Sequence, residues 1–426
     1  MTRTAPSSLD SEPSDPGDEN RPPWRPGAYA RASAAMLGWL VLRAGLQAAM
    51  AVALARILGA TQYGQFIATI AVAGFFAPLA GLGLQGVILR DGARDPRSIP
   101  TLLGGALALI AISLPLAWVA AAALAFWLLP PGIGIGITLL VLGVEIAATT
   151  LTELVGRTEQ SLHRASRFGA IQTGLSLVRL AAFVPWLAFS HPSTRSWMVA
   201  YASSTAAYLA LVLAFFYRRH VPRKPASAPW RLVAQGLPFA AGATAMRLQG
   251  ELNKPLLAGL GWFLAADLSL SQRAVDLANL PLVAMQEALW SRVYASDDPQ
   301  ARLRRVAPPM LAAAALGAAV LALAAPLLAL LLGPDYNEAV HALRLLAALP
   351  VVQLLRNLGN ATLVANGHAS VLTRVYLASG MVSAIMAVIL IKGFGLDGAI
   401  AAAYIAELST VAAQRLLQPR SSQCAK

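Results

Sequence analysis

The sequence predicts an all-α integral membrane protein with twelve transmembrane helices, arranged as two six-helix lobes around a central cavity. The composition, the recurrence of apolar runs and the distribution of positive charge all lead to this fold class. Of the 426 residues, 57% are hydrophobic and 12% are charged, about half the charged fraction of ordinary soluble domains. Together with a mean hydropathy of +0.60, this composition excludes a cytosolic enzyme of the usual kind.

Apolar runs recur from residue 32 almost to the end of the chain. Each is long enough to cross about 30 Å of hydrocarbon at about 1.5 Å per residue. Because backbone polar groups must be satisfied within lipid, these runs are expected to be helices. The expected spans are residues 32–58, 65–89, 99–129, 133–156, 168–190, 196–217, 232–260, 264–293, 306–332, 338–366, 372–391 and 398–418. Short loops are expected between them, for example GATQYG at 59–64.

The basic stretch at 218–231 separates six spans from six. LARILGATQYG at 54–64 pairs with LLAGLGWFLAA at 256–266 at an offset near 203 residues, which supports two similar halves, as in many transporters. The first 31 residues are rich in Pro, Ser and acidic residues and are expected to be disordered. The predicted organisation is a cytoplasmic tail at 1–31, an N-lobe at 32–217, a cytoplasmic basic linker at 218–231, a C-lobe at 232–418 and a cytoplasmic tail at 419–426.

Positive charge is distributed asymmetrically between the two sides of the predicted membrane. The two tails and the even-numbered connections hold 23 Lys and Arg residues, whereas the odd-numbered connections hold only Arg195 and Lys392. The positive-inside rule then places both termini in the cytoplasm. The net charge of +13 is therefore explained by membrane topology, and no nucleic-acid partner is implied.

Motifs for covalent chemistry are missing from the sequence. The single cysteine, Cys424, excludes an internal disulfide and a cysteine-based zinc site, and the five histidines form no HExxH pair. GLGLQG at 81–86 and GFGLDG at 393–398 match a dinucleotide fingerprint, but neither follows a strand in a soluble βαβ unit. We therefore expect no enzyme activity, no catalytic residue, no metal and no bound cofactor.

Charged residues inside the spans are the candidates for function, because a charge near the bilayer centre costs about 2.5 to 3.5 kcal/mol on insertion scales. One interpretation is mutual neutralisation within a helix, which the i,i+3 and i,i+4 spacings of five residues favour. These five are Arg247, Glu251, Lys254, Arg273 and Asp276. The other interpretation is that such residues face a hydrated cavity.

Three central arginines have no acid on their own helix, namely Arg43, Arg179 and Arg356. Central guanidinium groups without partners in lipid indicate a pocket for an anionic passenger, because the planar fork binds the paired oxygens of phosphate or carboxylate. The candidate substrate-binding residues are Arg43, Arg247, Lys254, Arg273, Arg179 and Arg356. The candidates for binding a coupling H⁺ or Na⁺ are Glu251, Asp267 and Asp276, since such carboxylates can bind an ion alternately with the passenger.

Several segments, taken together and in order, resemble the Wzx-type polysaccharide and lipid-linked oligosaccharide flippases of the multidrug/oligosaccharidyl-lipid/polysaccharide (MOP) exporter superfamily. They are ARILGATQYGQF (55–66), GLGLQGVILR (81–90), HRASRF (163–168), LPF (237–239), ELNKPLLAGLG (251–261), GPDYNEAVHALRLL (333–346) and FGLDGAIAA (394–402). In that family, basic cavity residues on the first, seventh and eighth helices hold the anionic head group. The matching positions here are Arg43, Arg247, Lys254 and Arg273.

The resemblance implies a multi-pass protein of the bacterial cytoplasmic (inner) membrane. It would flip a polyprenyl-(pyro)phosphate-linked oligosaccharide by alternating access, with the glycan polymerase and glycosyltransferases of the same pathway as partners. A multidrug or lipid II exporter of the same superfamily is an alternative. A membrane glycan polymerase or ligase is an alternative of another class, although such enzymes usually carry a sizeable outer loop.

Overall fold

The computed structural model describes residues 28–417 apart from 190, 225–228, 295–297 and 366–370, so the predicted tails at 1–27 and 418–426 lie outside it. The described residues are almost all helical and contain no strand. The helices of the first half are α1 (Ala28–Ala80), α2 (Leu84–Arg94), α3 (Ile99–Leu128), α4 (Ile135–Ser161), α5 (Ala165–Ala181), α6 (Phe183–Phe189) and α7 (Thr194–Tyr217). Those of the second half are α8 (Pro229–Glu251), α9 (Asn253–Ala258), α10 (Trp262–Tyr294), α11 (Pro299–Ala324), α12 (Pro326–Leu332), α13 (Asn337–Leu346), α14 (Leu349–Ala365) and α15 (Val371–Leu417). Single 3₁₀ turns, η1 (Pro96–Ser98) and η2 (Pro334–Tyr336), precede α3 and α13.

The twelve predicted spans are present, although the helix boundaries group them differently. Helices α1 and α15 each contain two spans, joined at Gly59 (φ 76°) and Gly395 (φ 58°). Both glycines adopt left-handed backbone conformations that other residues rarely take. The prediction of a loop over 59–64 is therefore wrong, because only Gly59 departs from helical geometry there.

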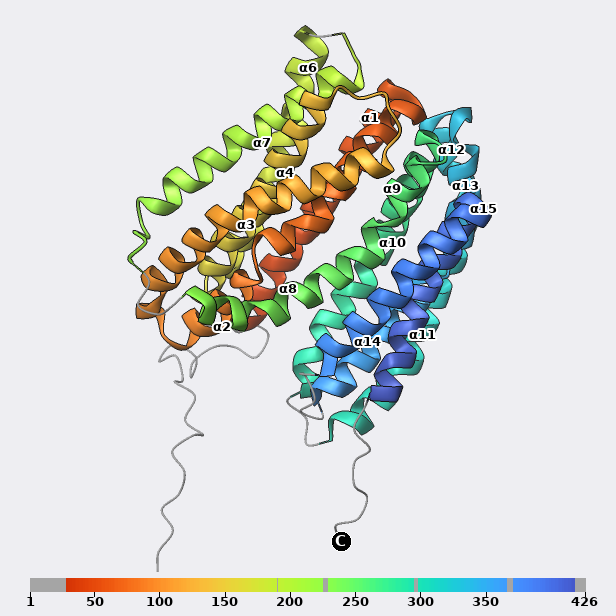
Figure 1. The fold of residues 1–426 in the computed structure, drawn as a ribbon. Coiled ribbons are helices and arrows are strands. Elements are labelled where there is room, and N and C mark those ends of the chain that lie inside the picture. Colours follow the sequence, from red (N-terminus) through yellow and green to blue (C-terminus); the bar gives the residue numbers. More distant parts are fainter. Residues whose placement is uncertain (1–27, 190, 225–228, 295–297, 366–370, 418–426) are drawn as a thin grey trace, which may run out of the picture.

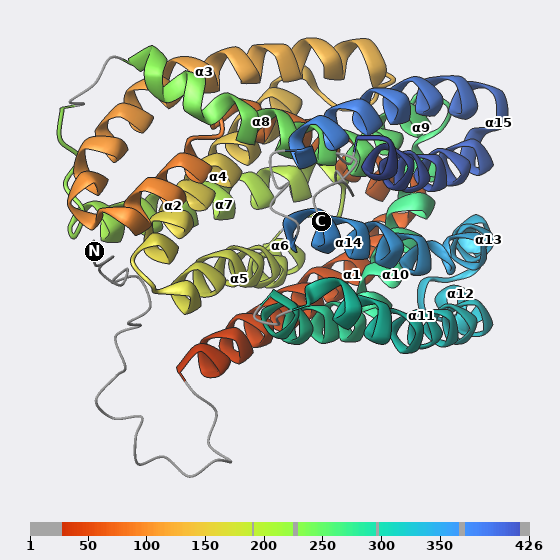
Figure 2. The ribbon, with the colours of Figure 1, turned by 90° about the horizontal axis from the view of Figure 1, so that it is seen from below.

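Two helical bundles stand side by side in Figure 1, one containing α1 to α7 and the other containing α9 to α15. The view from below in Figure 2 shows the same division. Helix α8 links the bundles, because it packs against α15 as well as against α1 and α2. This arrangement agrees with the predicted pair of six-helix lobes.

The two lobes meet at the end of the molecule drawn uppermost in Figure 1, in a hydrophobic cluster that combines residues of α1 with residues of α9, α10 and α13. Here the Tyr336 hydroxyl donates a hydrogen bond of 2.8 Å to the carbonyl oxygen of Ala55 in the other lobe. A Cβ atom on Gly64 would lie 1.8 Å from the carbonyl oxygen of Trp262, so only glycine permits this backbone contact. We call this lobe contact, formed by Ala55, Gly64, Trp262 and Tyr336, the upper seal.

The GLGLQG motif forms a break between α1 and α2 and not a nucleotide loop. Gly83 has a φ of 67°, and a Cβ atom there would lie 2.1 Å from the carbonyl oxygen of Gly236 on α8. The glycines therefore allow α2 and α8 to approach closely at the lower end of the molecule, opposite the upper seal.

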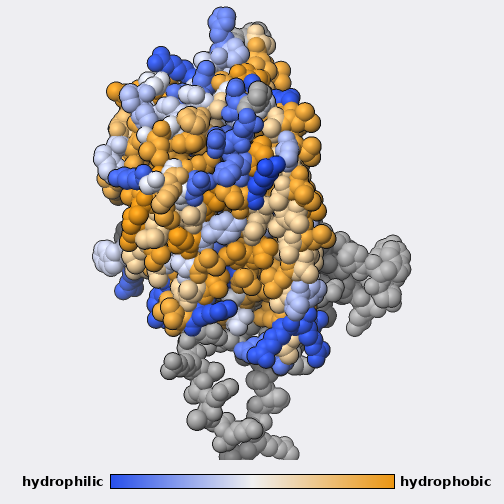
Figure 3. Space-filling view, turned by 90° about the vertical axis from the view of Figure 1, so that its right-hand side faces the viewer, coloured by the Kyte–Doolittle hydropathy of each residue, from blue (hydrophilic) through white to orange (hydrophobic). Residues whose placement is uncertain are grey.

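The outer surface is suited to lipid. Hydrophobic side chains cover much of the face in Figure 3, whereas hydrophilic ones gather at its lower end and form patches over its upper half. Large apolar side chains such as Trp127 and Leu323 are about four-fifths exposed. Among the described residues, eight helical segments are long and apolar enough to cross a membrane, and two of them, Ala35–Ala80 and Val371–Leu417, each hold two spans. The chain is a multi-pass membrane protein.

Candidate functional site

A cavity of about 300 Å³ lies between the two lobes, lined by α1, α4, α5, α7, α8 and α10. We call it the central cavity. Its charged lining residues are Arg43, Glu145, Glu153, Arg179, Arg247, Glu251 and Arg273. Four of the six residues predicted to bind the passenger therefore share one cavity, although they come from four different helices.

Arg43, on α1, is half-buried in the central cavity and forms no hydrogen bond or ion pair with any described residue. The charged residues that act electrostatically on Arg43 are Arg247, Glu153 and Arg179. Glu153 is itself engaged by Arg157, whose Nε lies 2.8 Å from a carboxylate oxygen. The Arg43 guanidinium consequently has its hydrogen-bonding capacity free for water or a ligand.

Arg179 has no acid on its own helix, as predicted, but in contrast to Arg43 it has a carboxylate partner on another helix. Its side chain is buried, and its Nη2 donates to the Glu145 carboxylate on α4, while its Nε donates to the Thr205 hydroxyl at 3.0 Å. The Tyr201 hydroxyl donates to the same carboxylate oxygen at 2.9 Å, and the Arg179 guanidinium lies 4.4 Å from the Tyr201 ring centroid. This network joins α4, α5 and α7 and forms one wall of the cavity.

Helical spacing suggested three ion pairs on α8 to α10. The Glu251–Lys254 pair is close, the Arg247–Glu251 pair is long, and the Arg273–Asp276 pair is not formed. Lys254 Nζ lies 2.7 Å from a Glu251 carboxylate oxygen, whereas the closest Arg247–Glu251 approach is 3.9 Å. Arg273 forms no ion pair with Asp276, and its buried Nε has no hydrogen-bond partner among the described residues. Arg247 and Arg273 are thus only weakly compensated in the cavity.

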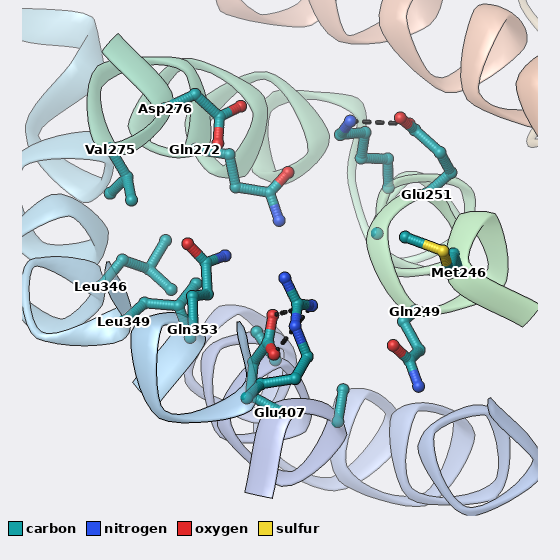
Figure 4. Close-up of a pocket in the computed structure, with 15 residues that line it drawn as sticks. Met246, Gln249, Glu251, Gln272, Val275, Asp276, Leu346, Leu349, Gln353 and Glu407 are labelled. Atoms are coloured by element: carbon teal, nitrogen blue, oxygen red, sulfur yellow. Dashed lines mark hydrogen bonds and ion pairs between the residues drawn. The ribbon is translucent and has the colours of Figure 1, made fainter. Parts of the chain in front are cut away.

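A second cavity, of about 250 Å³, lies within the C-lobe among α8, α9, α10, α13, α14 and α15. Figure 4 shows Glu251 on one wall and Glu407 on the opposite wall. Lys254, which also lines this cavity, is the ion-pair partner of Glu251. Arg356 lines this cavity, with its Nη1 2.9 to 3.0 Å from both Glu407 carboxylate oxygens. Arg356 has no acid on its own helix, as predicted, but its partner Glu407 lies on α15, so the guanidinium is neutralised from another helix.

The three predicted carboxylates for a coupling ion lie in different surroundings. Glu251 borders both cavities, and Asp276 lines the C-lobe cavity. Asp267 lies in neither and is fully buried. Among the residues that the structure describes, no group of three or more His, Cys, Asp or Glu side chains is placed to hold a metal ion.

Sequence reasoning missed the uncharged polar lining of both cavities. Gln47 and Ser176 are hydrogen-bonded to each other at 3.3 Å in the central cavity, and Gln249, Gln272 and Gln353 project into the C-lobe cavity in Figure 4. The glutamines within the apolar spans could have indicated this lining, because a side-chain amide inside a membrane needs hydrogen-bond partners.

Comparisons with known proteins identify the fold of the chain but no sequence family to which it belongs. No protein-family model matches the chain, and no curated protein matches it. Among solved structures, an inward-facing multidrug resistance MATE family transporter of the MOP superfamily matches with a TM-score of 0.63 and 18% identity, over 92% of this chain and 96% of that one. An outward-facing MATE transporter matches with a TM-score of 0.58 and 15% identity, over 91% and 94%.

A third solved structure is of a MOP superfamily transporter from Pyrococcus furiosus, whose title reports that a reverse polarity of its binding pocket suggests a different function. It matches with a TM-score of 0.56 and 14% identity, over 91% of this chain and 94% of that one. At these identities the likeness concerns the fold. The chain thus has the twelve-helix fold of MATE transporters of the MOP superfamily.

Proposed function

We propose that this protein is an alternating-access transporter that moves an anionic amphipathic molecule across the membrane. The observation that carries this proposal is the charge balance of the central cavity. Three arginines there are free or weakly compensated, namely Arg43, Arg247 and Arg273, whereas the acids of the same cavity are engaged by Arg179, Arg157 and Lys254. The lining therefore presents net positive charge to a ligand.

The chemistry of the free groups favours a phosphate or pyrophosphate. An arginine fork can donate two parallel hydrogen bonds to an oxyanion, and such charge-assisted bonds are about twice as strong as neutral ones. A cavity bounded by both lobes suits alternating access, because a relative movement of the lobes changes the side to which it opens. Polyprenyl-(pyro)phosphate-linked oligosaccharides combine an anionic group with a lipid tail and a polar glycan.

We accordingly propose a lipid-linked oligosaccharide as the passenger, with Arg43, Arg247 and Arg273 at its phosphate groups and Lys254, Arg179 and Arg356 in supporting positions. The proposed location is a bacterial inner membrane, with both termini in the cytoplasm. The glycosyltransferases that build the glycan and the polymerase that extends it would act before and after transport. Movement of H⁺ or Na⁺ would supply the driving force.

A multidrug exporter is a second candidate, and the comparisons favour it. Two of the solved structures of similar fold are named as multidrug resistance transporters. The acidic residues Glu145 and Glu153 in the central cavity are chemically suited to a cationic drug, although their partners Arg179 and Arg157 offset their charge.

Reconstitution in proteoliposomes tests both candidates. A fluorescent polyprenyl-pyrophosphate glycan and a cationic dye are supplied in separate assays, and the transfer of each is followed in the presence of a pH or Na⁺ gradient. We expect transfer of the anionic lipid, weakened by Arg43→Gln and unchanged by Arg344→Gln, a substitution of an exposed arginine outside both cavities. Transfer of the dye alone would favour the multidrug exporter and refute the anionic passenger.

A further inference from the structure

One buried acidic residue has no role in the mechanism above. Asp267, on α10, has a fully buried side chain, and both of its carboxylate oxygens lack any hydrogen-bond partner among the described residues. The neighbouring Ser271 hydroxyl bonds to two backbone carbonyls, those of Asp267 and Ala339, and not to the carboxylate. A buried ionised carboxylate without a partner is strongly unfavourable.

Asp267 lies close to the upper seal. Its adjacent residues Ala266 and Leu268 belong to the hydrophobic cluster that joins the lobes. Tyr336, which bonds to Ala55 across the lobes, is near enough to Asp267 for the two groups to interact electrostatically. Tyr63 on α1, another neighbour of Tyr336, also has a buried hydroxyl without a hydrogen-bond partner. This part of the seal is therefore buried and poor in compensating polar groups.

Among the described residues, no counter-ion faces Asp267 from the helices packed around it. The charged group that acts on it from α13 is Glu338, which has the same sign, and Asp335 adds a further acid beside Tyr336. On α9, Lys254 is paired with Glu251.

Among the described residues, the other helices packed against α10 place no cation at Asp267 either. On α1, Arg43 lines the central cavity, and the exposed Arg56 donates to the Leu330 carbonyl oxygen at 3.5 Å. The lysines and arginines of α11, α13 and α15 are exposed.

On α14, Arg356 is paired with Glu407 of α15. On α15, Asp397 is paired with His341 of α13. Arg273, on α10 itself, faces the central cavity.

We infer that Asp267 is a proton-binding site of the upper seal, and that the lobes close at this end only when Asp267 carries a proton. The inference rests on the proposed alternating access. When the lobes separate, α1 leaves α10, water reaches Asp267, and the ionised carboxylate is hydrated. When they close, the carboxylate is dehydrated without a partner, so the closed form binds the neutral acid. Closure is thereby linked to uptake of one proton, and raising the pH favours separated lobes.

Double electron–electron resonance measures this linkage directly. Spin labels are placed at Arg195→Cys and Leu331→Cys, both exposed and at the upper end of opposite lobes, with Cys424→Ser removing the single native cysteine. In the full chain in liposomes, the ratio of separated to closed molecules is expected to rise by up to about tenfold per pH unit in the range where one proton is lost. Asp267→Asn is a neutral near-isostere and should stay closed at every pH.

Two further variants control the measurement. Asp298→Asn removes an exposed acid at the N-cap of α11, where asparagine also caps a helix, and is expected to keep the pH dependence. Asp267→Glu is expected to retain a titration. Asp267→Ala is a second neutral variant that serves if the asparagine protein does not fold. A wild-type pH dependence that persists in Asp267→Asn or Asp267→Ala would overturn the inference. So would a shift that follows Na⁺ concentration at constant pH, because the site would then bind a metal cation.

The proposed passenger and the proton site fail in distinguishable ways. If the lobes respond to pH through Asp267 but no anionic lipid is transported, the proton site stands and the proposed passenger does not. If the distance between the two spin labels is the same at every pH in wild-type protein while the anionic lipid is transported, the proton site is refuted and the proposed passenger is supported.

Discussion

Arg43 and Arg179 both lie in the central cavity, but the structure predicts opposite consequences when each loses its charge. Arg179 neutralises the buried Glu145 carboxylate, which also accepts a hydrogen bond from Tyr201. In Arg179→Gln that carboxylate remains buried without its cation, and breaking one side of a buried ion pair typically costs about 3 to 5 kcal/mol. Arg43 neutralises no partner, so Arg43→Gln should leave the free energy of unfolding within about 0.5 kcal/mol of the wild-type value.

The effects on passenger binding follow from the same contacts. If Arg43 donates to a phosphate, its removal forfeits a hydrogen bond to a charged group, which is worth about 1.5 to 3 kcal/mol. Since about 1.4 kcal/mol is tenfold in affinity, binding of a polyprenyl pyrophosphate should weaken by about 10- to 150-fold. The Arg43 variant should thus be stable but a poor binder.

The assay compares Arg43→Gln, Arg179→Gln and the double variant Glu145→Gln/Arg179→Gln. Thermal unfolding in detergent micelles is followed by tryptophan fluorescence, and lipid binding by microscale thermophoresis. The double variant should recover much of the stability lost in Arg179→Gln, because no unpaired charge remains in the pair. Equal unfolding temperatures for the two single variants, or unfolding of Arg43→Gln at the lower temperature, would refute the distinction between free and paired arginines.

Two other substitutions test the lobe contact and the surface charge. Gly64→Ala would place Cβ against the Trp262 carbonyl oxygen, so it should loosen the upper seal and increase the labelling of nearby engineered cysteines. Gly45→Ala is the control, because its Cβ meets no atom within 4 Å, and it should leave the stability unchanged or slightly raised. The hydrogen bond from the Arg90 guanidinium holds the pKa of the Asp91 carboxyl below its ordinary value. The pair therefore stabilises the fold above about pH 4 and loses its effect as the pH falls further. Since both groups are partly exposed, Asp91→Asn should lower the free energy of unfolding by less than about 1 kcal/mol at pH 7, measured by thermal unfolding.

The spans could be predicted from the sequence because lipid restricts a crossing segment to a helix of sufficient length and low charge. The error over 59–64 has a local cause. Polar residues there suggested a loop, yet only Gly59 departs from helical geometry. The polar side chain of Gln62 is satisfied within the fold, because its oxygen accepts a hydrogen bond of 2.9 Å from the backbone nitrogen of Thr194. The polar side chain is used to begin α7, a long-range contact that the sequence does not reveal.

The cavity could be predicted only in part, for a related reason. Helical spacing reveals partners three or four residues apart, and the Glu251–Lys254 pair was found in this way. The partners of Arg179 and Arg356 are 34 and 51 residues away in the chain, on other helices. Spacing also suggested an Arg273–Asp276 pair, but Arg273 faces the central cavity and Asp276 lines the C-lobe cavity.

The unpaired groups of the two signs are not equivalent, and this asymmetry connects the proposed passenger to the proposed proton site. A guanidinium keeps its charge at every physiological pH, so an unpaired arginine persists in a membrane protein only where water or an anion can reach it. Arg43 meets that condition in the central cavity. A carboxylate has a further option, because it can bind a proton and become neutral. Asp267 borders neither of the two cavities and has no cationic partner among the described residues. The neutral, protonated acid is therefore the form that fits the closed seal.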